Sequence, residues 1–185
     1  MDLLLKGLGS LNTATPQSVQ LLLTLFSEAQ FKKGWLVCNP LLQTKPMLYY
    51  LSKGLLKGTT VYNRQIMTLW MMQEGFFISG NGFLFKSSIN ETIVCEKDST
   101  IFTLNLRKAE KLAVKNHGLY SMLIEIYERG LSESRTRELM LRLKTAGERK
   151  AFFQQHNAQL FDRLTTEQVA EVINVNRKYM YSIGK

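Results

Sequence analysis

Residues 164–183 have the sequence LTTEQVAEVINVNRKYMYSI, a pattern typical of two short helices joined by a tight turn. Thr165 is followed three residues later by Gln168, which is the capping-box pattern that begins a helix. The small side chain of Ala170 allows a second helix to cross close to this one. The other apolar side chains keep helical spacing and predict one buried stripe: Val169, Val172 and Ile173.

The second helix is predicted to begin after a turn at Asn174. Asparagine adopts the left-handed backbone conformation more readily than most residues, so it can end a helix and turn the chain. Asn176 can then cap the next helix, in which Met180 and Ile183 face inward. Four polar side chains are left facing outward: Arg177, Lys178, Tyr181 and Ser182.

Two cations at the start of a helix oppose its dipole, and this arrangement is better tolerated where a polyanion lies beside them. The segment therefore predicts a helix-turn-helix, the motif that places its second helix in the major groove of DNA. The alternative is an ordinary amphipathic hairpin at the end of a domain. The order of cap, small residue, turn residue, second cap and outward cations favours DNA binding.

Length and charge agree with a DNA-binding protein. The 185 residues suffice for one large domain or two small ones, and 45% of them are hydrophobic, as in globular proteins. Residues 1–106 hold 9 Lys and Arg against 6 Asp and Glu, a net charge of +3, whereas residues 107–185 hold 15 against 9, a net charge of +6. The basic excess is denser toward the C-terminus, which suits a nucleic-acid partner, although plain solubility charge would also account for it.

No segment predicts a membrane protein or an exported one. No apolar run approaches the roughly 20 residues that cross a bilayer. The first residues, MDLLLK, lack the basic leader, long apolar region and cleavage site of a signal peptide. The expected location is the cytoplasm, where the two cysteines, Cys38 and Cys95, are expected to be reduced thiols.

The sequence holds no pattern that predicts a cofactor or an enzyme. Iron–sulfur clusters usually need four cysteines, and His117 and His156 match no metal-ligand spacing. Nothing resembles a nucleophile triad or a Walker loop. A cupin-like enzyme is disfavoured because both histidines lie outside the β-rich region, where a cupin would hold its metal.

The N-terminal part is predicted to be a β-barrel or sandwich preceded by a helix from about Thr15 to Ala29. Residues 31–105 are rich in β-branched and aromatic side chains and in turn signals. Turns are expected at Lys53-Gly54, at residues 63–65 and at residues 96–99. The strands expected around them are 47–51, 55–62, 66–72, 92–95 and 100–104.

From Leu106 onward the pattern is helical. A stripe of apolar residues could pack on the chain's own sheet or form a dimer seam, and the seam prediction names Leu119, Met122, Leu123 and Ile126. A second helix is expected from about Ser134 to Ala146. Gly147 is expected to break it before a third helical piece around Phe152 and Phe153.

This order of elements resembles the Crp/Fnr family of bacterial transcription regulators. The resemblance is carried by FKKGWL at residues 31–36, LYYLSKG at residues 48–54 and the terminal motif at residues 165–183. It implies an α+β chain with a cyclic-nucleotide-binding-like jelly roll (a double-stranded β-helix) at residues 1–106, a dimerisation helix at 107–131 and a helix-turn-helix domain at 132–185.

The resemblance also implies how the chain would act. Family members bind near-palindromic double-stranded DNA as homodimers. The positions that contact bases fall on Arg177, Lys178 and Ser182, with Tyr181 beside them, and Thr166 is placed for a phosphate contact. Asn176, the expected cap, completes the predicted interface. RNA polymerase and an unidentified small-molecule effector are further candidate partners.

Two departures from the family pattern affect this prediction. No strands follow the recognition helix to build most of the family's wing, because the sequence stops at Lys185. The family's phosphate cassette has a Gly-Glu pair and an Arg-Ala pair that are missing here, and Glu91 would repel a phosphate. The pocket is therefore expected to be degenerate and not to respond to cyclic AMP; its residues would be Gly80, Asn81, Gly82, Asn90 and Glu91.

Two hypotheses remain open at this point. One is a sequence-specific dimeric transcription regulator that does not depend on cyclic AMP. The other is a small-ligand sensor that acts through protein partners and carries a vestigial DNA-binding domain.

Overall fold

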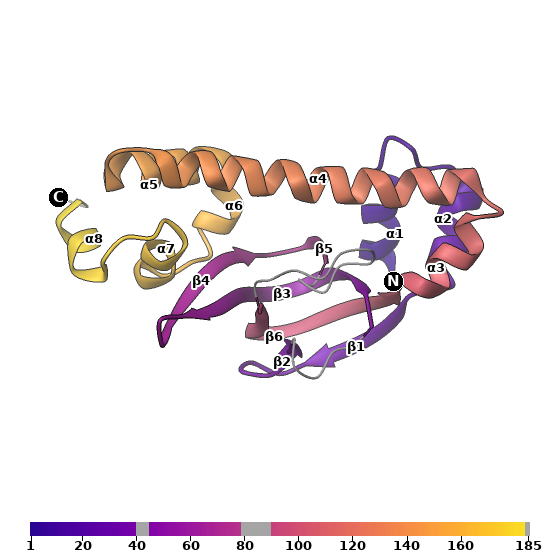
Figure 1. Ribbon diagram of the computed structural model, residues 1–185, viewed down its shortest axis with the longest axis horizontal. Helices are drawn as coiled ribbons and strands as arrows, with labels where there is room; N and C mark the ends of the chain where they lie inside the picture. The colour runs from indigo at the N-terminus through magenta and orange to yellow at the C-terminus, as the bar shows by residue number, and fades with distance from the viewer. Residues whose placement is uncertain (40–44, 79–89, 184–185) are drawn as a thin grey trace.

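One long strand, β3, organises the sheet (Figure 1). The computed structural model describes residues 1–39, 45–78 and 90–183, and only the backbone of Ser182 and Ile183. β3 pairs along one side with β6 and on the other with β4 and β5, while β1 and β2 pair with β6, all antiparallel. The strands are β1 (Ser27–Phe31), β2 (Leu36–Cys38), β3 (Met47–Tyr62), β4 (Gln65–Met72), β5 (Gly75–Ile78) and β6 (Thr92–Asn105).

Two predicted turns are wrong, because β3 and β6 each continue through them as one strand. Lys53-Gly54 lies inside β3, where the register with β6 shifts on both sides of Lys53 and Gly54 has a φ of +125°. Residues 96–99 likewise lie inside β6. A Cβ on residue 54 would collide with Ser99, so glycine serves an irregular crossing of two paired strands and not a reversal of the chain.

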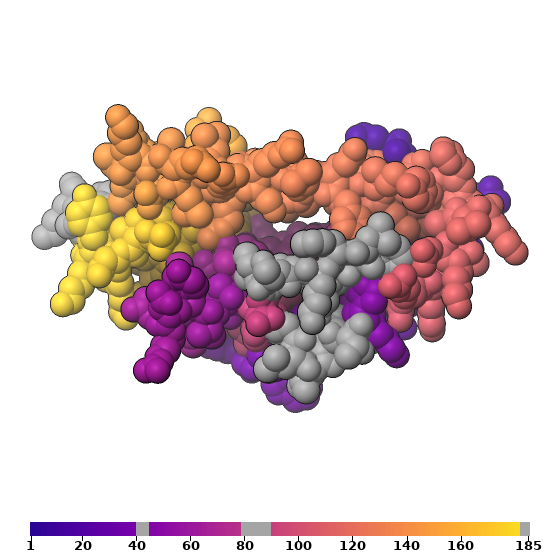
Figure 2. Space-filling model, viewed as in Figure 1, coloured from indigo at the N-terminus to yellow at the C-terminus, as the bar shows by residue number. Residues whose placement is uncertain are grey.

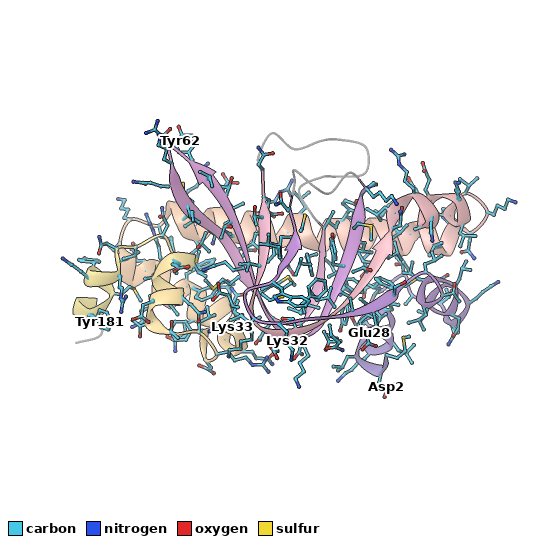
Figure 3. All side chains as sticks on the ribbon, turned by 90° about the horizontal axis from the view of Figure 1, so that it is seen from below. Asp2, Glu28, Lys32, Lys33, Tyr62 and Tyr181 are labelled. Atoms are coloured by element: carbon cyan, nitrogen blue, oxygen red, sulfur yellow. The ribbon has the colours of Figure 1, made fainter. Side chains whose placement is uncertain are left out.

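The predicted turn between β3 and β4 is confirmed. Asn63 and Arg64 have φ values of 50° and 62°, the left-handed pair that closes a two-residue hairpin with the twist of its strands. Tyr62 lies at the end of this hairpin, which projects from the body of the molecule (Figure 3). The apolar residues Val61 and Ile66 pair across it and are both largely exposed.

Helices lie at both ends of the chain. The first is preceded by Met1, and Pro16 occupies the first turn of the second, as expected. The predicted helix to Ala29 is shorter than expected, because Ala29 pairs with Ile101 in the sheet. No helix of the described ranges is long and apolar enough to cross a membrane. The helices are α1 (Asp2–Gly9), α2 (Pro16–Leu23), α3 (Leu106–Ala113), α4 (His117–Arg142), α5 (Ala146–His156), α6 (Ala158–Phe161), α7 (Thr166–Val172) and α8 (Arg177–Ile183).

α4 is a single helix of 26 residues that runs the length of the molecule over the sheet (Figure 1). It includes the stretch from Ser134 that was predicted as a separate helix, and it crosses the predicted domain boundary after residue 131. It ends at Arg142, and Gly147 lies inside α5 and does not break a helix. The helix thus connects the sheet domain directly to the C-terminal helices.

Burial corrects the predicted dimer seam. Leu119 and Met122 are fully buried and Ile126 is nearly so, in a core shared with α1, α2, α3 and the end of the sheet. Leu123 packs against the same core. Leu119, Met122 and Ile126 therefore serve the alternative given above, packing within their own chain, whereas Leu123 is only partly buried.

A buried carboxylate fixes the N-terminal helices to α4. Glu125, 7% exposed, accepts hydrogen bonds from the backbone N–H groups of Asn12 and Thr13, each at 2.9 Å. The Thr13 hydroxyl donates to it at 2.8 Å and the Arg129 guanidinium at 2.6 Å. This cluster joins the link between α1 and α2 to the N-terminal half of α4.

Candidate nucleic-acid interface

The capping box that begins α7 is confirmed. The Gln168 backbone N–H donates to Thr165 Oγ1 at 3.2 Å, and the Thr165 N–H donates to Gln168 Oε1 at 3.0 Å. Both donors would otherwise lack a partner at a helix start. The predicted stripe, Val169, Val172 and Ile173, is buried together with Ala170.

The turn after α7 has the predicted geometry. Asn174 has a φ of 53°, in the left-handed region. The Val175 N–H then donates to the Ala170 carbonyl at 2.9 Å, which closes the turn over the small residue. Asn176 Oδ1 accepts the Lys178 N–H at 2.9 Å and so caps α8 as expected.

α8 presents polar side chains outward. Arg177, Lys178 and Tyr181 are exposed, whereas Met180 is 3% exposed and packs into the helical core. Thr166 is exposed at the first residue of α7. Ser182 lies in α8, but its side chain and that of Ile183 fall outside the described part of the structure.

Glu167, which the sequence did not single out, lies between the two outward side chains of α8. Its Oε1 is 2.7 Å from Arg177 Nη2 and accepts the Tyr181 hydroxyl at 2.6 Å. The hydrogen bond from Tyr181, backed by the charge of Arg177, lowers the pKa of Glu167 to about 2. Glu167 is therefore ionised at neutral pH and forms an ion pair with the exposed Arg177.

A set of polar contacts ties α7 to the sheet. Glu171 accepts the Thr68 hydroxyl of β4 at 3.0 Å and lies 3.4 Å from Lys57 Nζ of β3. Lys57 Nζ is also 2.8 Å from Glu96 of β6, and both side chains are only 20% exposed. Gln168 donates to Glu96 at 3.2 Å. The first helix of the motif therefore rests on the sheet domain.

Arg137 of α4 provides a second tie between the helix-turn-helix and the sheet. Its Nη1 donates to the Val172 carbonyl at the end of α7 at 2.8 Å, and its Nη2 donates to the Thr68 carbonyl of β4 at 3.3 Å. Burial lowers the pKa of Arg137. No sequence pattern marks this residue, because its partners lie 35 and 69 positions away.

The predicted degenerate pocket lies largely outside the described residues. Gly80, Asn81 and Gly82 lie outside the described residues, whereas Asn90 and Glu91 lie within them. Glu91 accepts the Trp70 indole N–H at 2.6 Å, and the Asn90 carbonyl accepts the Thr60 hydroxyl at 3.0 Å. Within the described ranges, no three His, Cys, Asp or Glu residues are grouped to hold a metal ion.

Comparison with solved structures identifies the fold. No protein-family model and no curated protein sequence matches the chain. A CooA variant from Carboxydothermus hydrogenoformans superposes with a TM-score of 0.67 at 18% identity, covering 88% of this chain and 76% of the other. A protein from Eubacterium rectale, described as a transcriptional regulator of the Crp/Fnr family, gives 0.68 at 15% identity and 93% and 82% coverage.

FixK2 from Bradyrhizobium japonicum also superposes with a TM-score of 0.68, at 13% identity over 85% of this chain and 82% of the other. This chain has the Crp/Fnr fold. The predicted α+β architecture, with a sheet domain of the cyclic-nucleotide-binding type followed by a long helix and a C-terminal helical domain, is confirmed.

Proposed function

We propose that this chain is a transcription regulator that binds double-stranded DNA through α8. The observation that carries the proposal is the α7–turn–α8 unit, in which every backbone requirement of the motif is met and the outer face of α8 presents Arg177, Lys178 and Tyr181. The Crp/Fnr fold of the whole chain supports it. The net charge of +9 supplies the attraction to a polyanion.

Each outward side chain has a defined part in this proposal. Arg177 would donate two hydrogen bonds to O6 and N7 of guanine, a pair of acceptors that the major groove offers at no other base. Lys178 and Tyr181, with Ser182, would contact neighbouring base edges or phosphates, and Thr166 a phosphate. Glu167 must release Arg177 before Arg177 can contact a base.

A homodimer is part of the proposal, with its seam on the outer face of α4. Four exposed apolar side chains follow one another there at spacings of four, three and four residues: Tyr120, Ile124, Tyr127 and Leu131. This is the spacing of a coiled-coil seam, and it lies beside the buried stripe of α4, with Tyr127 and Leu131 at the border of the space between α4 and the sheet. Two copies joined along α4 would present two α8 helices to a near-palindromic site.

Cyclic AMP is not the proposed effector. The Gly-Glu and Arg-Ala pairs of the family cassette are missing from the sequence, and Glu91 is engaged with Trp70. Another small molecule would act on the sheet domain, and RNA polymerase would be the partner of the DNA-bound protein.

Selection of binding sites from random duplexes, followed by fluorescence anisotropy on the selected site, tests this function. Arg177→Ala should weaken binding to the selected site by about 1–3 kcal/mol and relax the preference at one base pair in each half-site. Lys108→Ala is the matched control, because Lys108 is an exposed cation on α3 at the far end of the molecule (Figure 1). Its removal should lower affinity for all sequences by less.

The opposite result would contradict the proposal. If no sequence is enriched, or if affinity does not depend on Arg177, α8 does not recognise DNA. A ligand-induced rise in melting temperature together with such a result would favour the alternative, a sensor that acts through protein partners.

A further inference from the structure

A cavity of about 1040 Å³ lies where α4, the β4–β5 edge of the sheet and the α5–α6 region meet. Figure 2 shows the molecule hollowed below the middle of α4. The sheet and α5 contribute five aromatic side chains to a lining that is otherwise mixed apolar and polar: Trp70, Phe76, Phe77, Phe152 and Phe153. This volume is at the upper end of the range that small-molecule sites occupy, and an aromatic lining is typical of such sites. The described part of the predicted cassette, Asn90 and Glu91, is not in the lining.

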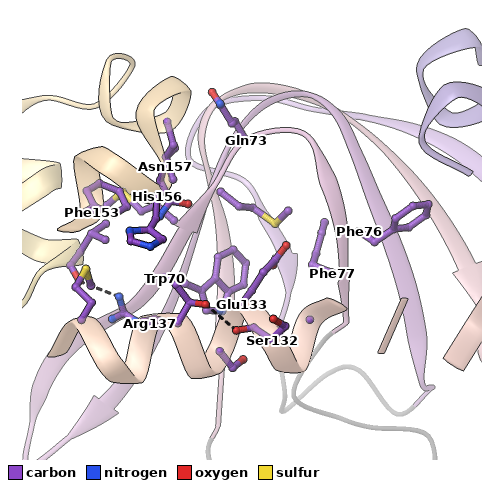
Figure 4. A pocket seen from close by; sticks show the side chains of 18 of the residues that line it. Trp70, Gln73, Phe76, Phe77, Ser132, Glu133, Arg137, Phe153, His156 and Asn157 are labelled. Atoms are coloured by element: carbon purple, nitrogen blue, oxygen red, sulfur yellow. Dashed lines mark hydrogen bonds between the residues drawn. The ribbon is translucent and has the colours of Figure 1, made fainter. Parts of the chain in front are cut away.

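The cavity wall contains a cation that lacks an anionic partner. Arg137 lines the cavity from α4 (Figure 4). Among the described residues its hydrogen bonds go to two backbone carbonyls, those of Val172 and Thr68, and no carboxylate lies within ion-pair distance. Desolvated charges in proteins are usually paired with an opposite charge, and for the partly buried Arg137 three of the five guanidinium N–H donors have no partner among the described residues.

Two carboxylates in the lining limit what the ligand can be. Glu74 lies 3.7 Å from Arg163, which compensates its charge. Glu133 remains partly open to the cavity, yet desolvation raises its pKa, so it takes up a proton more readily than an ordinary surface glutamate. Glu133 is exposed, so solvent screens its charge, and Arg137 is the group in the lining that would pair with a bound carboxylate.

We propose that this cavity binds an organic carboxylate with an apolar, ring-containing body. The carboxylate would accept two N–H groups of Arg137, and the body would lie against Trp70 and the phenylalanines of β5 and α5. Arg137 is suited to this because a guanidinium and a carboxylate form paired, charge-assisted hydrogen bonds. The site lies between the sheet and the C-terminal helices, and its wall residue Trp70 donates its indole N–H to Glu91.

Occupation of this site would alter the helix-turn-helix. The N–H groups that a carboxylate recruits belong to the side chain that ties Val172 of α7 and Thr68 of β4 together. A carboxylate bound to the remaining N–H groups would draw the guanidinium toward the cavity, weaken its bonds to those two carbonyls and so loosen α7 from the sheet. This coupling rests on the proposed DNA-binding function, whereas binding of the carboxylate does not.

Three probes of one shape test the site: 3-phenylpropionate, 3-phenylpropanamide and 3-phenylpropylamine. In a Trp35→Phe background Trp70 is the remaining tryptophan, so its fluorescence reports on the cavity wall. We expect the carboxylate to bind at least about tenfold more tightly than the amide at neutral pH, because hydrogen bonds between two charged groups contribute more than those between neutral ones. Equal affinities, or tighter binding of the amine, would overturn the proposal.

Three variants locate the binding. Arg137→Gln should remove the preference for the carboxylate and leave amide affinity within about twofold, while Arg135→Gln, an exposed arginine on the same helix, should change neither. Gly130→Phe should weaken both probes at least about tenfold, because Gly130 lines the cavity with open space beyond it and a phenyl ring would fill that space. If the carboxylate binds all three variants as it binds the parent, the site is elsewhere and the proposal fails.

A DNA titration separates this site from the proposed function. 3-Phenylpropionate should change the affinity for the selected duplex at least about threefold in the parent and not in Arg137→Gln. Carboxylate binding with no change in DNA affinity would overturn the proposed coupling to the helix-turn-helix but would support the proposed carboxylate site. If no duplex is bound at all, the fluorescence assay alone decides the site.

Discussion

In the proposed DNA complex, Glu167 would control how available Arg177 is to DNA. Its carboxylate accepts the Tyr181 hydroxyl and pairs with Arg177 at 2.7 Å, so DNA must compete for the same guanidinium. Glu167→Gln should raise affinity for both matched and scrambled duplexes about twofold to tenfold, because it removes one negative charge next to the DNA and frees a cation. Fluorescence anisotropy at several salt concentrations measures this, and the salt slope should steepen by about one.

Glu28→Gln makes the same change in net charge on β1, well away from Tyr181 (Figure 3). It should leave both affinities within about twofold, since charges beyond a Debye length are screened. A Glu167→Gln protein that binds DNA no better than Glu28→Gln would show that the ion pair does not limit Arg177.

Glu125 should make the stability of the chain sensitive to acid. Burial alone raises the pKa of Glu125, but hydrogen bonds from Asn12, Thr13 and Arg129 outweigh it and hold the pKa at about 2. A lowered folded-state pKa stabilises the fold above the unfolded value of 4.5, and that contribution is lost as the pH falls toward 2. Glu125→Gln should therefore destabilise the protein at pH 7, and the difference from wild type should shrink between pH 4.5 and 2.

Urea unfolding at pH 7, 4 and 3 measures this difference. At pH 7 we expect a loss of about 1.5–3 kcal/mol, because the amide cannot satisfy several donors at once. Glu128→Gln on the same helix is an exposed control and should stay within about 0.5 kcal/mol of wild type at each pH. A loss that stays constant from pH 7 to pH 3 would show that ionisation of Glu125 is not its source.

At the scale of elements, the proposed dimer depends on the exposed apolar side chains of α4. Ile124 is 40% exposed at the centre of the stripe, and a charge there would be buried in a dimer. Ile124→Glu should weaken the dimer at least about tenfold, through lost apolar burial and repulsion between the two introduced charges. Analytical ultracentrifugation measures the dissociation constant.

Lys115→Glu, an exposed change in the turn before α4, should leave that constant nearly unchanged. If the chain is a monomer before any substitution, or if Ile124→Glu remains a dimer, the seam is not on this face of α4.

The elements that local sequence predicted well are those that local forces determine. The caps at Thr165 and Asn176 and the left-handed residue Asn174 depend on neighbours within a few positions, and all three are confirmed. The turn predicted at Lys53-Gly54 was wrong because glycine marks a turn in many sequences. Here Gly54 allows β3 to cross β6 beside Ser99. The buried face of α4 could have been a core or a seam, because periodicity gives the stripe but not its partner.

At the scale of the whole molecule, the residues that sequence did not reveal are those whose partners are distant in the chain. Arg137 and Glu125 bind groups more than thirty and more than one hundred positions away. Such contacts leave no spacing pattern, since only the folded arrangement brings the groups together. The sheet domain, α4 and the helix-turn-helix are joined through these same long-range contacts, so the regulation of the chain was less predictable than its fold.

One of these long-range contacts is the pair of ion pairs that Lys57 forms with Glu96 and Glu171. They should determine how stably α7 packs on the sheet. Lys57→Ala removes the cation between the two carboxylates and leaves them facing each other across the boundary between β6 and α7. Hydrogen exchange in α7 should become faster by about fivefold or more, because a half-buried pair that loses one partner costs more than an exposed one. Lys53→Ala on the same strand is the control, since Lys53 is exposed. Equal exchange in both variants, with α7 as protected as in wild type, would mean that apolar packing against Leu55 and Met71 holds α7 without help from the ion pairs.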